Sequence, residues 1–119
     1  MKILIDTNIV LDLLLEREPF VENAIMIFEQ IEQGKLEGYI AATTITNIFY
    51  IIRKTENREV AIAAINQLLI GIQFCAVDLQ TVETALRLGL KDFEDSIQLA
   101  CATLSKLDGI VTRDRKGDF

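Results

Sequence analysis

The chain has 119 residues, of which half are hydrophobic and a quarter are charged, so we expect one globular domain covering residues 1–119. Its 18 acids outnumber its 12 bases and give a net charge of -6, which disfavours nonspecific binding to nucleic acid. If the protein acts on nucleic acid, cations must offset part of that charge. Histidine is absent, which excludes a Ser-His-Asp or Cys-His nucleophile, histidine-ligated zinc and a histidine general base.

The lengths of the apolar runs and the positions of the cysteines predict where in the cell the protein is found. No uninterrupted apolar run approaches the ~18 residues that span a bilayer, and the N-terminus does not read as a signal peptide. We therefore expect a cytoplasmic protein with no membrane contact. Cys75 and Cys101 lie in apolar runs without a Cys or His neighbour at metal-ligand spacing, which predicts buried, reduced thiols.

The first eight residues, MKILIDTN, predict a buried strand that ends at Asp6 and a helix that starts at Thr7 or Asn8. Threonine and asparagine both suit the N-cap, because their side-chain oxygens accept bonds from free backbone N–H groups. An acid at the carboxyl end of a buried strand lies where open α/β sheets bind ligands. The alternative is that Asp6 is itself the helix cap.

Farther along the chain, apolar residues recur at helical spacing in five segments: 20–33, 43–54, 60–70, 79–90 and 93–107. Thr43, Thr44 or Thr46 is expected to cap the second of these helices. Short apolar runs at 36–42, 72–77 and 110–112 predict three further strands. Strands separated by helices predict an α/β fold in which one parallel sheet of four or five strands has helices on both faces.

Acidic residues follow the first and the last predicted strand. Asp6 and Asp114 would lie at the same edge of the sheet, and Asp92 and Asp95 are three residues apart at the start of the last helix. Taken singly, Asp92 and Asp95 suit helix capping and Asp114 suits a solvated turn. If Asp6, Asp95 and Asp114 converge, their like charges need a cation, and oxygen ligands suit Mg²⁺ or Mn²⁺. Such a site activates water and stabilises charge on a phosphoryl group.

Two further features lie near these acids. Asn47 is one turn into the 43–54 helix and could point at the cluster, although an exposed helical amide is the alternative interpretation. Arg113, Arg115 and Lys116 flank Asp114, where they are either solvated charges or groups that hold phosphates beside a metal.

Four segments in this order resemble the PIN domain family of metal-dependent ribonucleases, which includes the toxins of many toxin–antitoxin pairs. They are ILIDTNIVLDLLL, TTITNIFYIIRK, KDFEDSIQLACA and IVTRDRKGDF, and they cover nearly the whole chain. The resemblance implies a three-layer α/β/α sandwich whose acids hold Mg²⁺ or Mn²⁺. Asp6, Asp95 and Asp114 match the family's main acids by position, and Asp92 and Asp118 match more variable ones. The family usually has glutamate at the position of Asn47.

From this resemblance the leading hypothesis is a Mg²⁺- or Mn²⁺-dependent endoribonuclease. It would be the toxin of a toxin–antitoxin pair, with RNA as substrate, an antitoxin as partner and a homodimeric assembly. Asp6, Asp95 and Asp114 would be metal ligands, and Asp92 and Asn47 would orient a ligand or water. The second hypothesis, motivated by Asn47, is a non-catalytic PIN-like module that binds RNA or protein. A third, a phosphohydrolase with Asp6 as nucleophile, requires an acid where Asn8 stands.

Overall fold

Four parallel strands form the centre of the protein in the computed structural model, which describes residues 1–113. Their spatial order is β3-β2-β1-β4. The strands are β1 (Lys2–Ile5), β2 (Glu37–Ala41), β3 (Gln73–Cys75) and β4 (Gly109–Val111). The predicted parallel sheet is therefore confirmed with four strands over the described residues.

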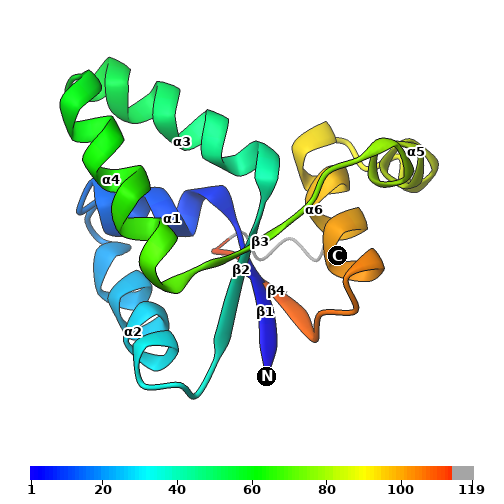
Figure 1. Ribbon diagram of the computed structural model, residues 1–119, viewed down its shortest axis with the longest axis horizontal. Coiled ribbons are helices and arrows are strands. Elements are labelled where there is room, and N and C mark those ends of the chain that lie inside the picture. Colours follow the sequence, from blue (N-terminus) through cyan, green and yellow to red (C-terminus); the bar gives the residue numbers. More distant parts are fainter. Residues whose placement is uncertain (114–119) are drawn as a thin grey trace.

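Helices cover both faces of this sheet. In chain order they are α1 (Thr7–Leu14), α2 (Val21–Glu32), α3 (Ala42–Thr55), α4 (Arg58–Gly71), α5 (Leu79–Leu88) and α6 (Phe93–Leu104). The helices α1 to α4 lie on one face of the sheet and α5 and α6 lie on the other (Figure 1). The predicted three-layer α/β/α sandwich is confirmed. Within the described part of the chain, no helix has the length and apolar character that crossing a membrane requires.

The central strand β1 supplies side chains to both halves of the core. Ile3 and Ile5 pack in the cluster beneath α1 to α4, and Leu4 packs in the cluster beneath α5 and α6. This alternation follows from the two-residue period of a strand. Because β1 is buried on both faces, its sequence is a continuous apolar run rather than an alternating one.

The connections place a topological switch point between β1 and β4. From β1 the chain passes through α1 and α2 to β2 on one side, and β4 pairs with β1 on the other side only after α5 and α6. The register pairs Ile5 with Val111, so the two strands end together. In open α/β sheets the crevice at such a point is where ligands bind. Asp6 stands directly at this position.

The predicted caps were partly wrong. Asp6, rather than Thr7 or Asn8, is the N-cap of α1, and its carboxylate accepts the Asn8 N–H at 3.0 Å. Helix α3 starts directly after β2, with Ala41 as a cap that makes no side-chain bond. Thr43, Thr44 and Thr46, the predicted caps, all lie inside α3, so none of them caps it.

The two thiols are as predicted. Cys75 and Cys101 are buried and unpaired. Burial raises the pKa of both thiols, and burial together with the nearby Cys75 raises the pKa of Cys101 to about 12. Since the thiolate is the reactive form, neither residue is a nucleophile at neutral pH.

Candidate active site

Asp6 is held at the switch point by its own backbone and by its side chain. Its N–H donates to the Val111 carbonyl at 3.0 Å, which extends the β1–β4 ladder by one bond. Its carboxylate caps α1, and the residue as a whole is only 7% exposed. Capping of α1 therefore does not prevent Asp6 from also binding a ligand. A carboxylate has two oxygens, and the bond to Asn8 fixes the direction in which the group points.

The environment of Asp6 disfavours its charged form. Burial is the largest cause that raises the pKa of Asp6, and the nearby Glu94 charge raises it further. The Asn8 N–H, the Gln98 amide and the Arg113 guanidinium act in the opposite direction but do not cancel the rise. A second negative charge beside the buried Asp6 carboxylate marks a place where a cation would be stabilised.

Glu94, in the first turn of α6, accepts hydrogen bonds from the N-terminal parts of α1 and α3 at this edge of the sheet. Its Oε2 accepts a bond from Thr7 Oγ1 of α1 at 2.8 Å and one from Asn47 Nδ2 of α3 at 2.7 Å. The Thr7 hydroxyl also lies 3.3 Å from Thr44 Oγ1. These contacts hold the glutamate of α6 toward α1 and α3. Asn47 is exposed, as one of the two interpretations of the sequence predicted, and its amide donates to a carboxylate.

Gln98 adds a buried amide to the same region. It lies one turn after Glu94 on α6 and is 1% exposed. Neither its Nε2 nor its Oε1 has a hydrogen-bond partner within the described residues that meets ordinary geometry. The Gln98 side chain lies near enough to Asp6 to lower the pKa of the Asp6 carboxyl. An unsatisfied buried amide costs free energy, which is typical of a position that holds a ligand or ordered water.

The predicted acids of the last helix divide into a cap and a half-buried residue. Asp92 is the N-cap of α6, because its carboxylate accepts the Glu94 N–H at 2.8 Å and the Asp95 N–H at 3.3 Å. The capping interpretation of Asp92 is therefore confirmed. Asp95 is half-buried in the first turn of α6. Asp114 and Asp118 lie outside the described residues, so Asp95 and Asp114 stay predicted ligands.

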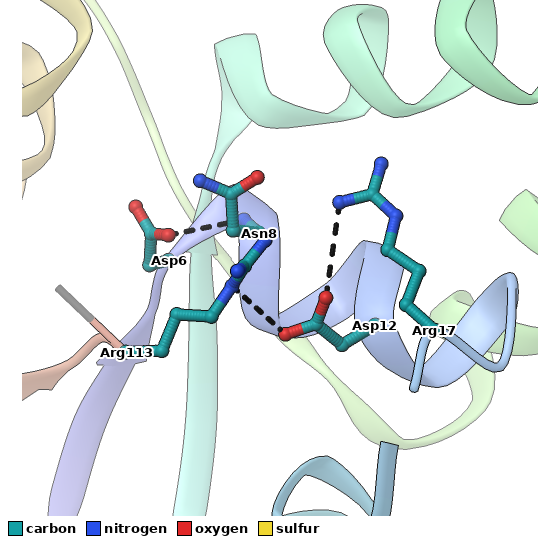
Figure 2. A network of polar contacts seen from close by, with 5 residues as sticks. All are labelled: Asp6, Asn8, Asp12, Arg17 and Arg113. Atoms are coloured by element: carbon teal, nitrogen blue, oxygen red, sulfur yellow. Dashed lines mark hydrogen bonds and ion pairs between the residues drawn. The ribbon is translucent and has the colours of Figure 1, made fainter. Parts of the chain in front are cut away.

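A second polar network, made of Asp12, Arg17 and Arg113, lies beside Asp6 and Asn8 (Figure 2). Asp12 of α1 is completely buried and forms ion pairs with Arg113 at 3.2 Å and with Arg17 at 3.7 Å. The Arg113 guanidinium also stacks on the Phe20 ring, with its carbon 3.9 Å from the ring centroid. Arg113 is therefore not a freely solvated charge. That it holds phosphate beside a metal stays a prediction, and Arg115 and Lys116 lie outside the described residues.

Sequence reasoning missed Glu94, Gln98 and Asp12. Glu94 and Gln98 are four residues apart, which is the spacing of one helix face and is the signal that pairs them. Asp12 is the lone acid in an apolar helical run, VLDLLL. Such a position predicts a buried charge, which requires a partner.

The oxygen groups at this edge fit a hard divalent cation. Asp6 and Glu94 supply carboxylates, and Asn47 and Gln98 supply amides, with no nitrogen or sulfur ligand nearby. Residues 1–113 contain no group of three acidic or cysteine side chains close enough to share a metal ion. The described part of the site would therefore hold a cation only with help from a further acid or from water.

The fold and this edge define a class: an α/β sandwich with carboxylates at the switch point of a parallel sheet. The family model of the PIN domain matches residues 2–116, and the chain belongs to that family. Comparison with curated protein sequences gives no significant match.

Three solved structures are similar in fold. They are VapBC2 from Rickettsia felis bound to a promoter DNA fragment (TM-score 0.73, 13% identity, 98% of this chain and 90% of that chain); the Mycobacterium tuberculosis toxin VapC20, which cleaves the sarcin-ricin loop (0.79, 13%, 96% and 91%); and a toxin–antitoxin complex from Klebsiella pneumoniae (0.69, 24%, 95% and 87%). At these identities the likeness shows a shared fold.

Proposed function

We propose that this PIN domain, comprising residues 1–119, is a Mg²⁺- or Mn²⁺-dependent endoribonuclease and the toxin of a toxin–antitoxin pair. The observation that carries the proposal is the pair of acids at the switch point. Asp6 is buried with a raised pKa beside Glu94, and the unpartnered amide of Gln98 lies next to it. Asp95 and Asp114 would complete the ligand set. The solved structures of similar fold include toxins and toxin–antitoxin complexes.

The chain's own residues would prepare this site before a metal arrives. The cap bond from Asn8 aims Asp6, and the bonds from Thr7 and Asn47 hold the Glu94 carboxylate toward α1 and α3. Asp92 stabilises the first turn of α6, which carries Glu94 and Asp95. A bound Mg²⁺ or Mn²⁺ would supply an activated water and neutralise charge on the phosphodiester. The proposed route is direct hydrolysis by water, without a covalent intermediate.

The direct test is cleavage of structured and unstructured RNAs by the purified protein with Mn²⁺, with Mg²⁺ and with EDTA. We expect internal cuts that require the metal and stop in EDTA. Intact RNA in Mn²⁺, under conditions where another PIN ribonuclease cuts, would contradict the proposal. Catalytically inactive Asp6→Asn protein, prepared in parallel, controls for contaminating nucleases.

The second candidate is a non-catalytic module that binds RNA or protein. The observation in its favour is that the Asn47 amide donates its hydrogen bond to Glu94 and brings no negative charge to the site. Calorimetry separates the two candidates. Heat of Mn²⁺ binding at millimolar metal supports the nuclease, and its absence supports the binding module.

An antitoxin partner, a homodimeric assembly and a cytoplasmic location belong to the same proposal. A groove of about 840 Å³ between α1, α2 and α4 suits an apolar segment of an antitoxin, because Ile25, Phe28 and Ile70 line it. Glu16 and Glu32 also line the groove and would favour basic residues in that segment.

The groove is tested by substitution within one helix. Ile25→Glu is expected to weaken binding of the proposed antitoxin by tenfold or more, because it buries a charge. Met26→Glu is the control, since Met26 is 57% exposed and does not line the groove. Equal effects of the two variants in a titration would argue against this surface.

A further inference from the structure

Helix α3 is basic although the protein as a whole is acidic. The helix contains Arg53 and Lys54 and no acidic residue, whereas the whole chain has a net charge of -6. Within the described part of the chain, neither of these two cations forms an ion pair. The helix begins at the candidate active site, because Asn47 in its second turn donates to Glu94. Unpaired cations on a helix that starts beside the acids suit the phosphates of a nucleic acid.

An exposed aromatic ring lies between Asn47 and these cations. Tyr50 follows Asn47 by three residues, which places both side chains on one face of α3, about 4.5 Å apart along its axis. Tyr50 is 58% exposed. Its ring is nevertheless held in place. Phe49 packs edge-on against it with ring centroids 5.5 Å apart, and the Arg53 guanidinium lies 5.9 Å from its centroid. The ring is therefore an ordered flat surface that is open to solvent.

An open hollow lies beside this ring, between α3 and α4, which run side by side (Figure 1). Its volume is about 360 Å³, and Tyr50 forms part of its wall. The rest of the wall includes three apolar side chains and two polar ones: Phe49, Ile62, Ile65, Thr46 and Asn66. Apolar and aromatic walls with a few polar groups are typical of sites that bind small organic groups. A hydroxyl and an amide can bond to the edge of a nucleobase whose face lies on an aromatic ring.

We propose that this hollow binds an unpaired nucleobase of the RNA substrate, next to the phosphodiester that is cleaved. Tyr50 stacks on the base, while Thr46 and Asn66 contact its edge. Arg53 and Lys54 bind the backbone phosphates beyond it. The inference rests on the proposed function and adds to it that the substrate is single-stranded at this position, because a paired base cannot be splayed out onto an aromatic ring.

The charge around the hollow favours RNA over a protein segment as its occupant. Among the described residues, no acid lines this hollow, and the nearby cations of α3 match phosphates. The groove proposed for the antitoxin, between α1, α2 and α4, is instead lined by Glu16 and Glu32, which would repel a phosphate backbone. The hollow is also continuous with the candidate active site through α3, because Thr46 in its wall is the neighbour of Asn47.

Tyrosine fluorescence can report on Tyr50 directly, because the protein has no tryptophan and only two tyrosines. The substitution Tyr39→Phe leaves Tyr50 as the sole tyrosine and keeps the ring that packs beneath α5 and α6. The full-length protein with Tyr39→Phe and Asp6→Asn is titrated in EDTA with short single-stranded RNA of mixed sequence, so that no cleavage occurs. We expect the RNA to quench the fluorescence. The same RNA annealed to its complement should bind about tenfold more weakly.

Affinities of labelled RNA, measured by fluorescence polarisation, test the separate parts of the site. Tyr50→Ala is expected to weaken binding about tenfold or more, whereas Tyr50→Phe, which keeps an aromatic face, should bind as the parent protein does. Arg53→Gln should weaken binding about threefold or more and reduce its salt dependence. Arg87→Gln is the matched control, because Arg87 also lies in the last turn of its helix and its loss removes the same interaction with the helix dipole.

Fluorescence that RNA leaves unchanged, or equal RNA affinities of Tyr50→Ala and its parent, would overturn the nucleobase site. If Tyr50→Ala instead changed the oligomeric state or the affinity for the antitoxin, with RNA affinity unchanged, the hollow would be a protein interface and the proposal would be wrong. Failure of the proposed function gives a different result. RNA would bind and quench Tyr50, which supports the site, yet the wild-type protein with Mn²⁺ would leave that RNA uncut.

Discussion

Replacing Asp6 with asparagine is expected to abolish Mn²⁺ binding and RNA cleavage while the fold stays intact. The substitution removes one charge from the pair of acids at the switch point and keeps the shape of the side chain. Asparagine is also an excellent N-cap, so the bond from the Asn8 N–H to this side chain is retained. Because Asp6 is the proposed central ligand, the loss should exceed the 10–100-fold typical of groups that act through a ligand.

The measurements are calorimetric Mn²⁺ titration and single-turnover cleavage of RNA. Asp108→Asn is the matched control, because Asp108 is exposed and lies far from Asp6 along the strands. It accepts the Lys2 N–H at 2.7 Å, at the amino-terminal end of β1. Wild-type Mn²⁺ affinity in Asp6→Asn would remove Asp6 from the site.

The pH dependence of the metal-free protein gives an independent readout of the same residue. The pKa of Asp6 in the folded protein lies above its ordinary value of 3.8, chiefly because of burial. The folded state therefore binds this proton more tightly than the unfolded state. Its contribution to stability is fully present below pH 3.8 and is lost as the pH rises through the raised pKa. Urea unfolding should show the wild type losing stability relative to Asp6→Asn over this range.

Replacing Glu94 with glutamine is expected to weaken Mn²⁺ binding by about 10–100-fold and to slow cleavage with it. Glutamine keeps an oxygen that accepts from Thr7 and Asn47, so the packing between α1, α3 and α6 should survive. What the variant removes is the negative charge that acts on Asp6. Glu83→Gln, at an exposed position of α5, is the control.

An exchange of partners sharpens this test. Asn47→Glu alone places a second acid against Glu94 and removes the donor, so it should destabilise the metal-free protein. Combined with Glu94→Gln, it restores one charge and one donor with their positions exchanged. Partial recovery of Mn²⁺ affinity in the double variant is the expected result. Wild-type affinity in Glu94→Gln alone would show that Glu94 has no part in the site.

The structure also explains the departure of Asn47 from the family pattern. A carboxylate at position 47 would face the Glu94 carboxylate without a proton to share. Asparagine instead donates to Glu94 at 2.7 Å, so this region keeps its second acid on α6 rather than on α3. The proposed ribonuclease site would therefore take its second acid from α6.

Local patterns in the sequence determined the secondary structure and the sheet. The continuous apolar run Ile3-Leu4-Ile5 indicated a strand buried on both faces, and helical periodicity located the helices to within a few residues. Such patterns depend on which face of an element is buried, and this information is local. Parallel order followed from the alternation of strands and helices. Asp6 was identified because it stands where an apolar run ends.

Only the tertiary structure decided which polar groups meet. Thr7, Asn47 and Glu94 are separated by 40 residues or more, and no local pattern pairs them. The same is true of Asp12 and Arg113, whose contact depends on β4 lying beside β1. The cap of α1 also depended on context, since Asp6, Thr7 and Asn8 all suit an N-cap. The backbone bond between Asp6 and Val111 keeps Asp6 extended and lets the helix begin at Thr7, so the sheet rather than cap preference chose the residue.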